Sequence, residues 1–113
     1  MQIQVTKKHI EKGKLNDCYS CPVALALSDT FMGTRAYVDG ISLVIGYGIV
    51  FQTAFSVGTP KKVNDFIEKF DEMKPVKPFS FRIRKPTKKE LKKLKEEHGL
   101  YCIKEYKCCI KTV

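Results

Sequence analysis

The sequence predicts a small α+β fold in which two or three helices pack on a mixed or antiparallel sheet. Two patterns alternate along the chain: apolar residues at every second position, typical of strands, and apolar residues at helical spacing. The chain has 113 residues, 43% of them hydrophobic, which suits one domain with one modest core. We therefore expect a single domain over residues 1–113, with the core in 1–84 and a basic helix and C-terminal strand in 85–113.

The N-terminal part of the chain predicts a strand, a polar connection and a buried helix. Apolar and polar residues alternate over 2–6, which indicates a half-buried strand. Residues 7–17 are polar and contain a glycine, which is typical of a connection. Ser20 is a suitable helix cap and Pro22 suits a first helical turn. The apolar run that follows, 23–27, predicts a helix that is buried on nearly all sides.

The middle of the chain predicts a small meander followed by an amphipathic helix. Residues 36–57 are rich in β-branched and aromatic residues and carry turn signals at 39–40 and 46–48, which predicts two or three antiparallel strands. Thr59 and Pro60 predict a helix start, with a cap followed by proline at the first helical position. Four apolar residues then recur at helical spacing: Val63, Phe66, Ile67 and Phe70.

The C-terminal part predicts a strand, a helix and a last strand. Pro75 and Pro78 are expected to end the preceding helix. Residues 79–84 alternate between apolar and polar or basic residues, which predicts a strand with one apolar and one basic face. A threonine and a glutamate with capping-box spacing then begin a helix over 88–98. The tail, 100–113, has strand-like spacing and is interpreted as a final strand.

Positive charge is concentrated near the C-terminus. Twenty-one Lys and Arg against twelve Asp and Glu give a net charge of +9, and 82–111 hold eleven basic and four acidic residues. Such a surface favours an anionic partner, nucleic acid first and a nucleotide second, although a merely solvated lysine-rich helix has the same composition. This segment lacks Asn and Gln, which favours phosphate contacts over reading of base edges. The expected anion-binding residues are Arg82, Arg84, Lys85, Lys88, Lys89, Lys92, Lys93 and Lys95.

Two of the five cysteines have the spacing of metal ligands or of a redox pair. Cys18 and Cys21 are separated by two residues, and Cys21 precedes a helix, a position that lowers the pKa of a thiol. The commoner interpretation of Cys21 is a small buried hydrophobic residue. We assign no metal ligand, and zinc stays open because two more ligands would have to come from elsewhere in the chain: His9, His98, Cys102, Cys108 or Cys109.

No enzyme motif is visible in the sequence. It contains no phosphate-binding loop, dinucleotide fingerprint, nucleophile elbow or paired metal-binding histidines, so we expect no catalytic residues. The beginning of the chain lacks the apolar stretch of a secretory signal. The longest apolar run, 41–51, is about half the length of a membrane-spanning helix. With an odd number of cysteines, these features predict a protein with reduced thiols in a cytoplasm.

Three segments carry a family resemblance: Cys18-x-x-Cys21-Pro22-Val23-Ala24-Leu25-Ala26-Leu27, Val63-x-x-Phe66-Ile67-x-x-Phe70-Asp71 and Val76-x-Pro78-Phe79-x-Phe81. Through them the chain resembles a family of small, mostly uncharacterised bacteriophage and prophage proteins, over roughly residues 1–84. The resemblance implies a shared fold, expression in the cytoplasm of a bacterial host cell, and binding directed at the host. It brings no catalytic residues.

These observations favour a small, basic, non-enzymatic binding protein of phage type that acts on nucleic acid or a nucleotide. Two alternatives stay open. The same basic face is suited to inhibiting a host defence protein complex by protein–protein binding. In the second alternative, the protein is a zinc-stabilised interaction module that Cys18 and Cys21 hold together.

Overall fold

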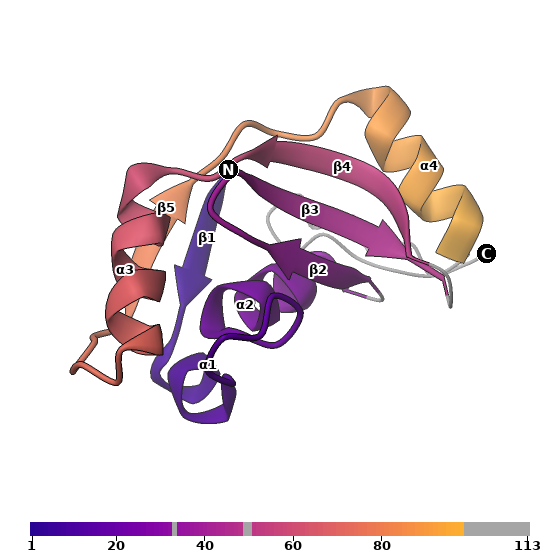
Figure 1. The fold of residues 1–113 in the computed structure, drawn as a ribbon. Helices are drawn as coiled ribbons and strands as arrows, with labels where there is room; N and C mark the ends of the chain where they lie inside the picture. Colours follow the sequence, from indigo (N-terminus) through magenta and orange to yellow (C-terminus); the bar gives the residue numbers. More distant parts are fainter. Residues whose placement is uncertain (33, 49–50, 99–113) are drawn as a thin grey trace.

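The chain folds into two antiparallel sheets with helices packed on them, in a computed structural model that describes residues 1–32, 34–48 and 51–98 (Figure 1). The two-stranded sheet joins β1 (Gln2–Val5) to β5 (Phe79–Arg82). The three-stranded sheet is a meander of β2 (Arg35–Val38), β3 (Ser42–Tyr47) and β4 (Gln52–Gly58). The described helices are α1 (Lys7–Lys12), α2 (Pro22–Thr30), α3 (Lys61–Asp71) and α4 (Lys88–His98). The α+β prediction is confirmed, with two small sheets rather than one.

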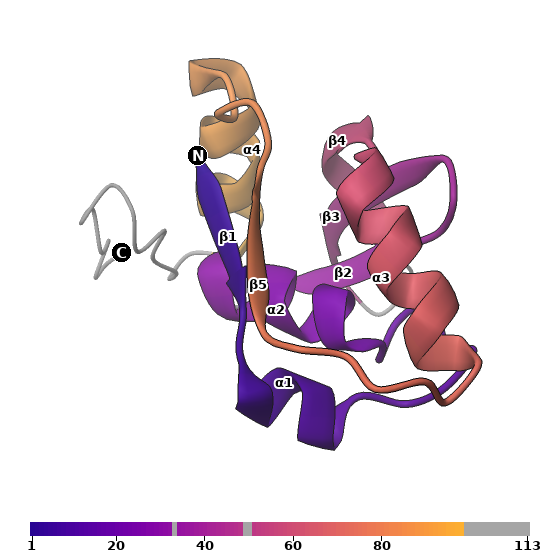
Figure 2. The ribbon, with the colours of Figure 1, turned by 90° about the vertical axis from the view of Figure 1, so that its left-hand side faces the viewer.

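The core lies around α2, which contacts both sheets (Figure 2). Five of its nine residues are buried, as the apolar run in the sequence predicted. Ile3 and Val5 of β1 approach this helix on one side, and Ala36 and Val38 of β2 are buried on the other. The Phe31 ring, just after α2, lies 5.8 Å from the ring of Phe55 in β4. One buried helix thus joins two sheets that share no strand.

The short helix α1 lies where we predicted a polar connection, and that prediction is wrong. Thr6 Oγ1 accepts a hydrogen bond from the His9 backbone N–H (3.4 Å), and His9 Nδ1 accepts one from the Thr6 backbone N–H (3.0 Å). The two residues form a capping box that starts the helix. His9 Nε2 also lies 2.6 Å from the Asp29 carboxylate, which ties α1 to α2.

Two predicted helix starts are displaced by one residue. The N-cap of α2 is Cys21 rather than Ser20, and the Cys21 sulfur accepts a hydrogen bond from a backbone N–H of the first turn (3.4 Å). The N-cap of α3 is Pro60, which we expected at the first helical position. Thr59 caps nothing, because its hydroxyl donates to the Asp39 carbonyl (2.8 Å). The apolar face predicted for α3 is confirmed, since Val63 and Phe66 are buried.

The predicted turn at 46–48 begins later than expected. Gly46 and Tyr47 continue β3, opposite Thr53 and Gln52 of β4, and Gly48, with φ of 87°, follows the strand. The register shifts between Ile45 and Gly46, which is a β-bulge.

Two elements end earlier than predicted. α3 ends at Asp71, well before Pro75, and Met73 has φ of 61°. β5 ends at Arg82, so Arg84 lies beyond the strand and does not share a strand face with it. The helix over 88–98 forms with the predicted bounds. The predicted strand over 100–113 lies outside the described residues, and no helix in the described ranges has the length and apolar character needed to span a membrane.

Candidate anion-binding site

The predicted site begins with a network at the start of α4. The Glu90 carboxylate accepts hydrogen bonds from both Arg84 Nη1 (2.9 Å) and Arg84 Nη2 (3.0 Å). It also accepts one from the Thr87 backbone N–H (2.8 Å), while Thr87 Oγ1 accepts from the Glu90 backbone N–H (3.2 Å). The predicted capping box is therefore confirmed. The hydrogen bonds from Arg84, the largest cause, and those from Thr87 lower the pKa of Glu90 to about 2.

Two of the predicted anion-binding residues donate hydrogen bonds to the protein's own backbone. Arg84 Nη2 donates to the carbonyl of Ser56 (3.2 Å), and the Arg84 guanidinium lies 4.7 Å from the centre of the Phe55 ring. Lys93 Nζ donates to the carbonyl of Thr53 (2.8 Å). Both carbonyls belong to β4, so these cations attach α4 and the segment before it to the three-stranded sheet.

The remaining predicted residues divide into three groups. Arg82, Lys88 and Lys89 are exposed and have no hydrogen bond or ion pair with any described residue. Lys85 and Lys92 are exposed and make contacts of their own. The side chain of Lys95 lies outside the part of the chain that the structure describes.

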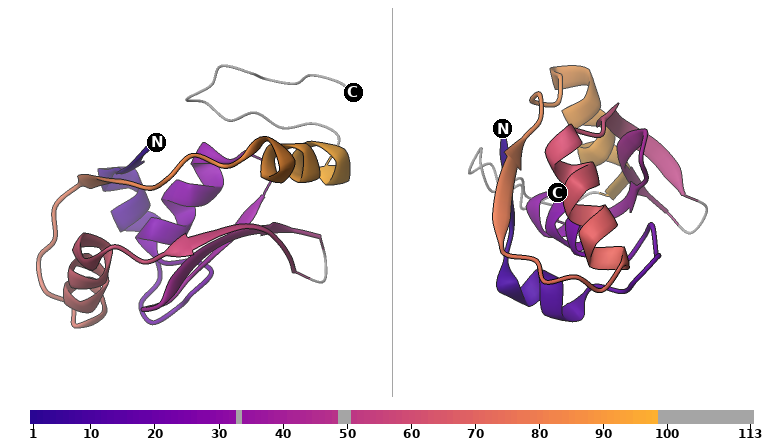
Figure 3. Two further views of the ribbon diagram at one scale, coloured as in Figure 1. Left: turned by 90° about the horizontal axis from the view of Figure 1, so that it is seen from above. Right: turned by 60° about the vertical axis from the view of Figure 1, so that its left-hand side comes forward.

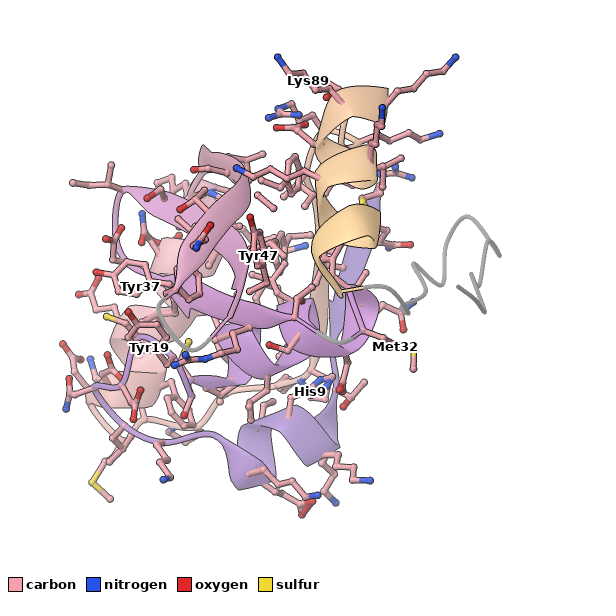
Figure 4. The ribbon with its side chains drawn as sticks, turned by 90° about the vertical axis from the view of Figure 1, so that its right-hand side faces the viewer. His9, Tyr19, Met32, Tyr37, Tyr47 and Lys89 are labelled. Atoms are coloured by element: carbon pink, nitrogen blue, oxygen red, sulfur yellow. The ribbon has the colours of Figure 1, made fainter. Side chains whose placement is uncertain are left out.

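Lys88 and Lys89 occupy the first two positions of α4, where positive charge is unfavourable. The amino end of a helix carries the positive end of the helix dipole, and a cation there is destabilised by a few tenths of a kcal/mol or more. Figure 4 shows the Lys89 side chain at the end of α4, directed away from the body of the protein. The helix dipole therefore does not favour two lysines at this place.

The cysteine pair does not have the properties of a reactive thiol pair. Cys21 is buried, and desolvation raises the pKa of its thiol, which overturns the expected lowering at a helix N-terminus. Cys18 is half-buried, and its carbonyl accepts a hydrogen bond from Val38 N–H (2.9 Å). Within the described ranges, no three His, Cys, Asp or Glu side chains gather as metal ligands. The other three cysteines, which could complete a zinc site, lie outside those ranges.

An arginine held by aromatic rings lies outside the residues predicted from the sequence. The Arg35 guanidinium lies 5.2 Å from the centre of the Tyr19 ring and 5.8 Å from that of Phe51. Tyr19 in turn packs edge-on against Tyr37 (5.2 Å) and Phe51 (5.9 Å). We call these four residues the Arg35 cluster. The signal in the sequence was Arg35-x-Tyr37, two large polar-tipped residues on the solvent face of a strand.

A groove of about 370 Å³ between α3 and the segment before β5 adds further positive charge. Its aromatic wall is Phe66 and Phe79, whose ring centres lie 4.6 Å apart. Lys62 Nζ lies 5.8 Å from the centre of the Phe79 ring, and Lys69 and Lys77 also line the groove. Lysines therefore also line a groove beside α3, together with Asp65, outside the region that we predicted.

Comparison of the chain with protein-family models, with curated proteins and with solved structures finds no match.

Proposed function

We propose that the protein is a non-enzymatic binding protein of bacteriophage type, acting in the cytoplasm of a bacterial host and binding the phosphate backbone of nucleic acid through the first turn of α4. The observation that carries this proposal is the pair Lys88 and Lys89, which is exposed, has no described partner and stands against the helix dipole. A partner that brings phosphates to this turn relieves the unfavourable charge and releases counterions.

The capping network supports the same proposal, because it fixes the helix turn that carries the two lysines. Thr87, Glu90 and Arg84 are joined by hydrogen bonds of 2.8 to 3.2 Å, and Arg84 also donates to the Ser56 carbonyl of β4 (3.2 Å). A preorganised helix end loses less conformational entropy when it binds a ligand than a mobile segment does. The lysine side chains remain flexible, which suits contact with phosphates rather than with particular bases.

The test is a salt titration of binding to a labelled oligonucleotide, with the double variant Lys88→Gln/Lys89→Gln. Removing two phosphate contacts is expected to weaken binding and to lower the slope of log affinity against log salt concentration by about 2. The matched control is Lys7→Gln/Lys8→Gln, because these exposed lysines occupy the same two positions in α1.

The control separates a local site from net charge, since both variants remove two positive charges. The proposal is supported if the α4 variant loses clearly more affinity and slope than the α1 variant. Equal losses mean that only the total charge matters, and the assignment to α4 is then wrong. Failure of the wild-type protein to bind any oligonucleotide at low salt overturns the proposed function itself.

A further inference from the structure

The Arg35 cluster lies on the face of the three-stranded sheet that no described helix covers. Along β2, Arg35 and Tyr37 alternate with the buried Ala36 and Val38, so their side chains point away from the core. Figure 3 shows α1, α2 and α4 on the other side of this sheet. Tyr19 reaches the same face from the loop before α2, with 44% of its surface exposed, and lies beside Tyr37 (Figure 4).

Gly46 makes room for the aromatic part of the cluster. Arg35 is opposite Gly46 in the strand register. A Cβ atom on Gly46 would lie 2.5 Å from the Phe51 ring and 2.6 Å from the Gln52 carbonyl, so only glycine lets the ring rest on the strand. Arg35, Gly46 and Phe51 therefore form one packed unit across β2, β3 and the start of β4.

The guanidinium in this unit is oriented by packing but has no hydrogen-bond acceptor among the residues that the structure describes. Arg35 is exposed and makes no hydrogen bond or ion pair with any described residue. Its Cζ lies over two aromatic rings, which restricts its rotamers, while its N–H groups can still donate to a ligand. Such an edge matches the paired oxygens of a phosphate.

Two aspartates in the loops next to this cluster, Asp17 and Asp39, are held by backbone N–H groups, and Asp39 also accepts a hydrogen bond from the Tyr37 hydroxyl. Asp17 accepts hydrogen bonds from Tyr19 N–H (2.9 Å) and from the backbone N–H of the next residue (3.0 Å). Asp39 accepts from two backbone N–H groups in the β2–β3 turn (both 2.8 Å). Neither aspartate forms an ion pair with Arg35. The cluster thus presents a guanidinium without a described ion-pair partner beside the exposed Tyr19 ring and the half-buried rings of Tyr37 and Phe51.

We propose that the Arg35 cluster binds single-stranded nucleic acid, with Arg35 donating hydrogen bonds to a phosphate and Tyr19 stacking on an unpaired base. This inference rests on the proposed function and narrows its substrate class. Aromatic side chains beside cations on a sheet surface are the usual way to hold unpaired bases, whose faces are hidden in a duplex. The protein's net charge of +9 favours an anionic ligand.

The first experiment compares Tyr19→Leu with Tyr19→Phe, using a single-stranded oligonucleotide and the duplex of the same sequence. Leucine keeps apolar bulk but removes the ring, so single-strand affinity is expected to fall about fivefold or more. Phenylalanine keeps the ring and is expected to retain binding. Duplex affinity and the salt slope are expected to stay unchanged, because no cation is removed.

Arg35→Gln is a second variant, and it is expected to change the salt dependence of binding as well as the affinity. It is expected to weaken single-strand binding and to lower the salt slope by about 1, while it leaves duplex binding unchanged. Thermal unfolding of each variant checks that the fold is intact. Photo-crosslinking of a halogenated single strand is expected to attach the strand to Tyr19.

The outcomes separate this inference from the proposed function. If Tyr19→Leu and Arg35→Gln bind single strands like wild type while Lys88→Gln/Lys89→Gln is weakened, the cluster is not the base-binding surface and α4 still binds nucleic acid. A second measurement captures host proteins on the wild-type protein after nuclease treatment. If Tyr19→Leu and Arg35→Gln no longer capture a host protein that wild type does, the cluster is a protein-docking surface and the inference is wrong. If wild type binds no nucleic acid, both proposals fail.

Discussion

The basic segment around α4 and the Arg35 cluster differ in how many cations they contain and in how many of these are free to bind a ligand. The first is rich in Lys and Arg, yet Arg84 and Lys93 donate to carbonyls of β4, and Arg84 also pairs with Glu90. The second contains one cation, Arg35, which has two aromatic neighbours and no described hydrogen-bond acceptor. The number of cations in a segment therefore does not tell how many can receive a ligand, because tertiary contacts decide which donors are already used.

The largest effect is expected from Gly46→Ala, which breaks the cluster rather than the basic segment. The new methyl group meets the Phe51 ring and a backbone carbonyl at about 2.5 Å, and such overpacking costs about 1–3 kcal/mol. Urea denaturation measures the loss, and near-ultraviolet circular dichroism reports the displaced rings. Gly58→Ala is the control, because its Cβ meets nothing closer than 4.0 Å and is expected to change stability by less than about 0.5 kcal/mol. Equal stability of Gly46→Ala and wild type would show that the cluster is not packed as described.

The next largest loss of stability is expected at Glu90, whose carboxylate accepts hydrogen bonds from Arg84. Glu90→Ala removes the carboxylate from the Arg84 guanidinium and from the Thr87 N–H, and about 1–2 kcal/mol of stability is expected to be lost. Glu90→Gln keeps an acceptor for Thr87 but no charge, so its loss should be smaller. Urea denaturation of the two variants ranks them. If neither variant is destabilised, Arg84 is as available as Arg35 and the contrast between the two regions disappears.

Acid should remove the same contact gradually. The folded-state pKa of Glu90 is about 2, below its ordinary value of 4.5, so the ionised form stabilises the folded state. This contribution is fully present above about pH 4.5 and is lost as the pH falls towards about 2. Because solvent screens the pair, we expect about 1 kcal/mol. The stability difference between wild type and Glu90→Gln should therefore narrow over this range, and a constant difference would contradict the assignment.

The smallest effect is expected where lysines oppose the dipole of α4. Lys88→Gln/Lys89→Gln should leave stability unchanged or raise it by a few tenths of a kcal/mol, because positive charge leaves the amino end of the helix. Thermal unfolding at low salt is the sensitive measurement, since salt screens the effect. A clear loss of stability would mean that these lysines serve the fold, as Arg84 does, and are not reserved for a ligand.

The parts of the fold that the sequence predicts are those with a local signal. α3 and α4 have apolar spacing or a capping box within a few residues, and both form. α1 was missed because its only apolar residue is Ile10 and its capping box uses a histidine in place of glutamate. The pairing of β1 with β5 joins the two ends of the core, and no local pattern reports such a distant partner.

The candidate site divides in the same way. The sequence locates the lysine-rich helix, because composition is a property of a continuous segment. The sequence does not show that Arg84 donates its hydrogen bonds to Glu90 and to β4. These contacts depend on where the chain lies after the end of β5. The Arg35 cluster is built from Tyr19, Arg35, Tyr37 and Phe51, which only the folded chain brings together.

The contacts of Arg84 and Lys93 with β4 have a consequence for self-association. β4 lies at the edge of its sheet, and an edge strand offers its carbonyls to any chain that can add a further strand. Two of these carbonyls, Ser56 and Thr53, already accept hydrogen bonds from cationic side chains. A second copy that approached this edge would meet both occupied acceptors and like charge. Arg84, before α4, and Lys93, within it, therefore disfavour the addition of a further strand at this edge.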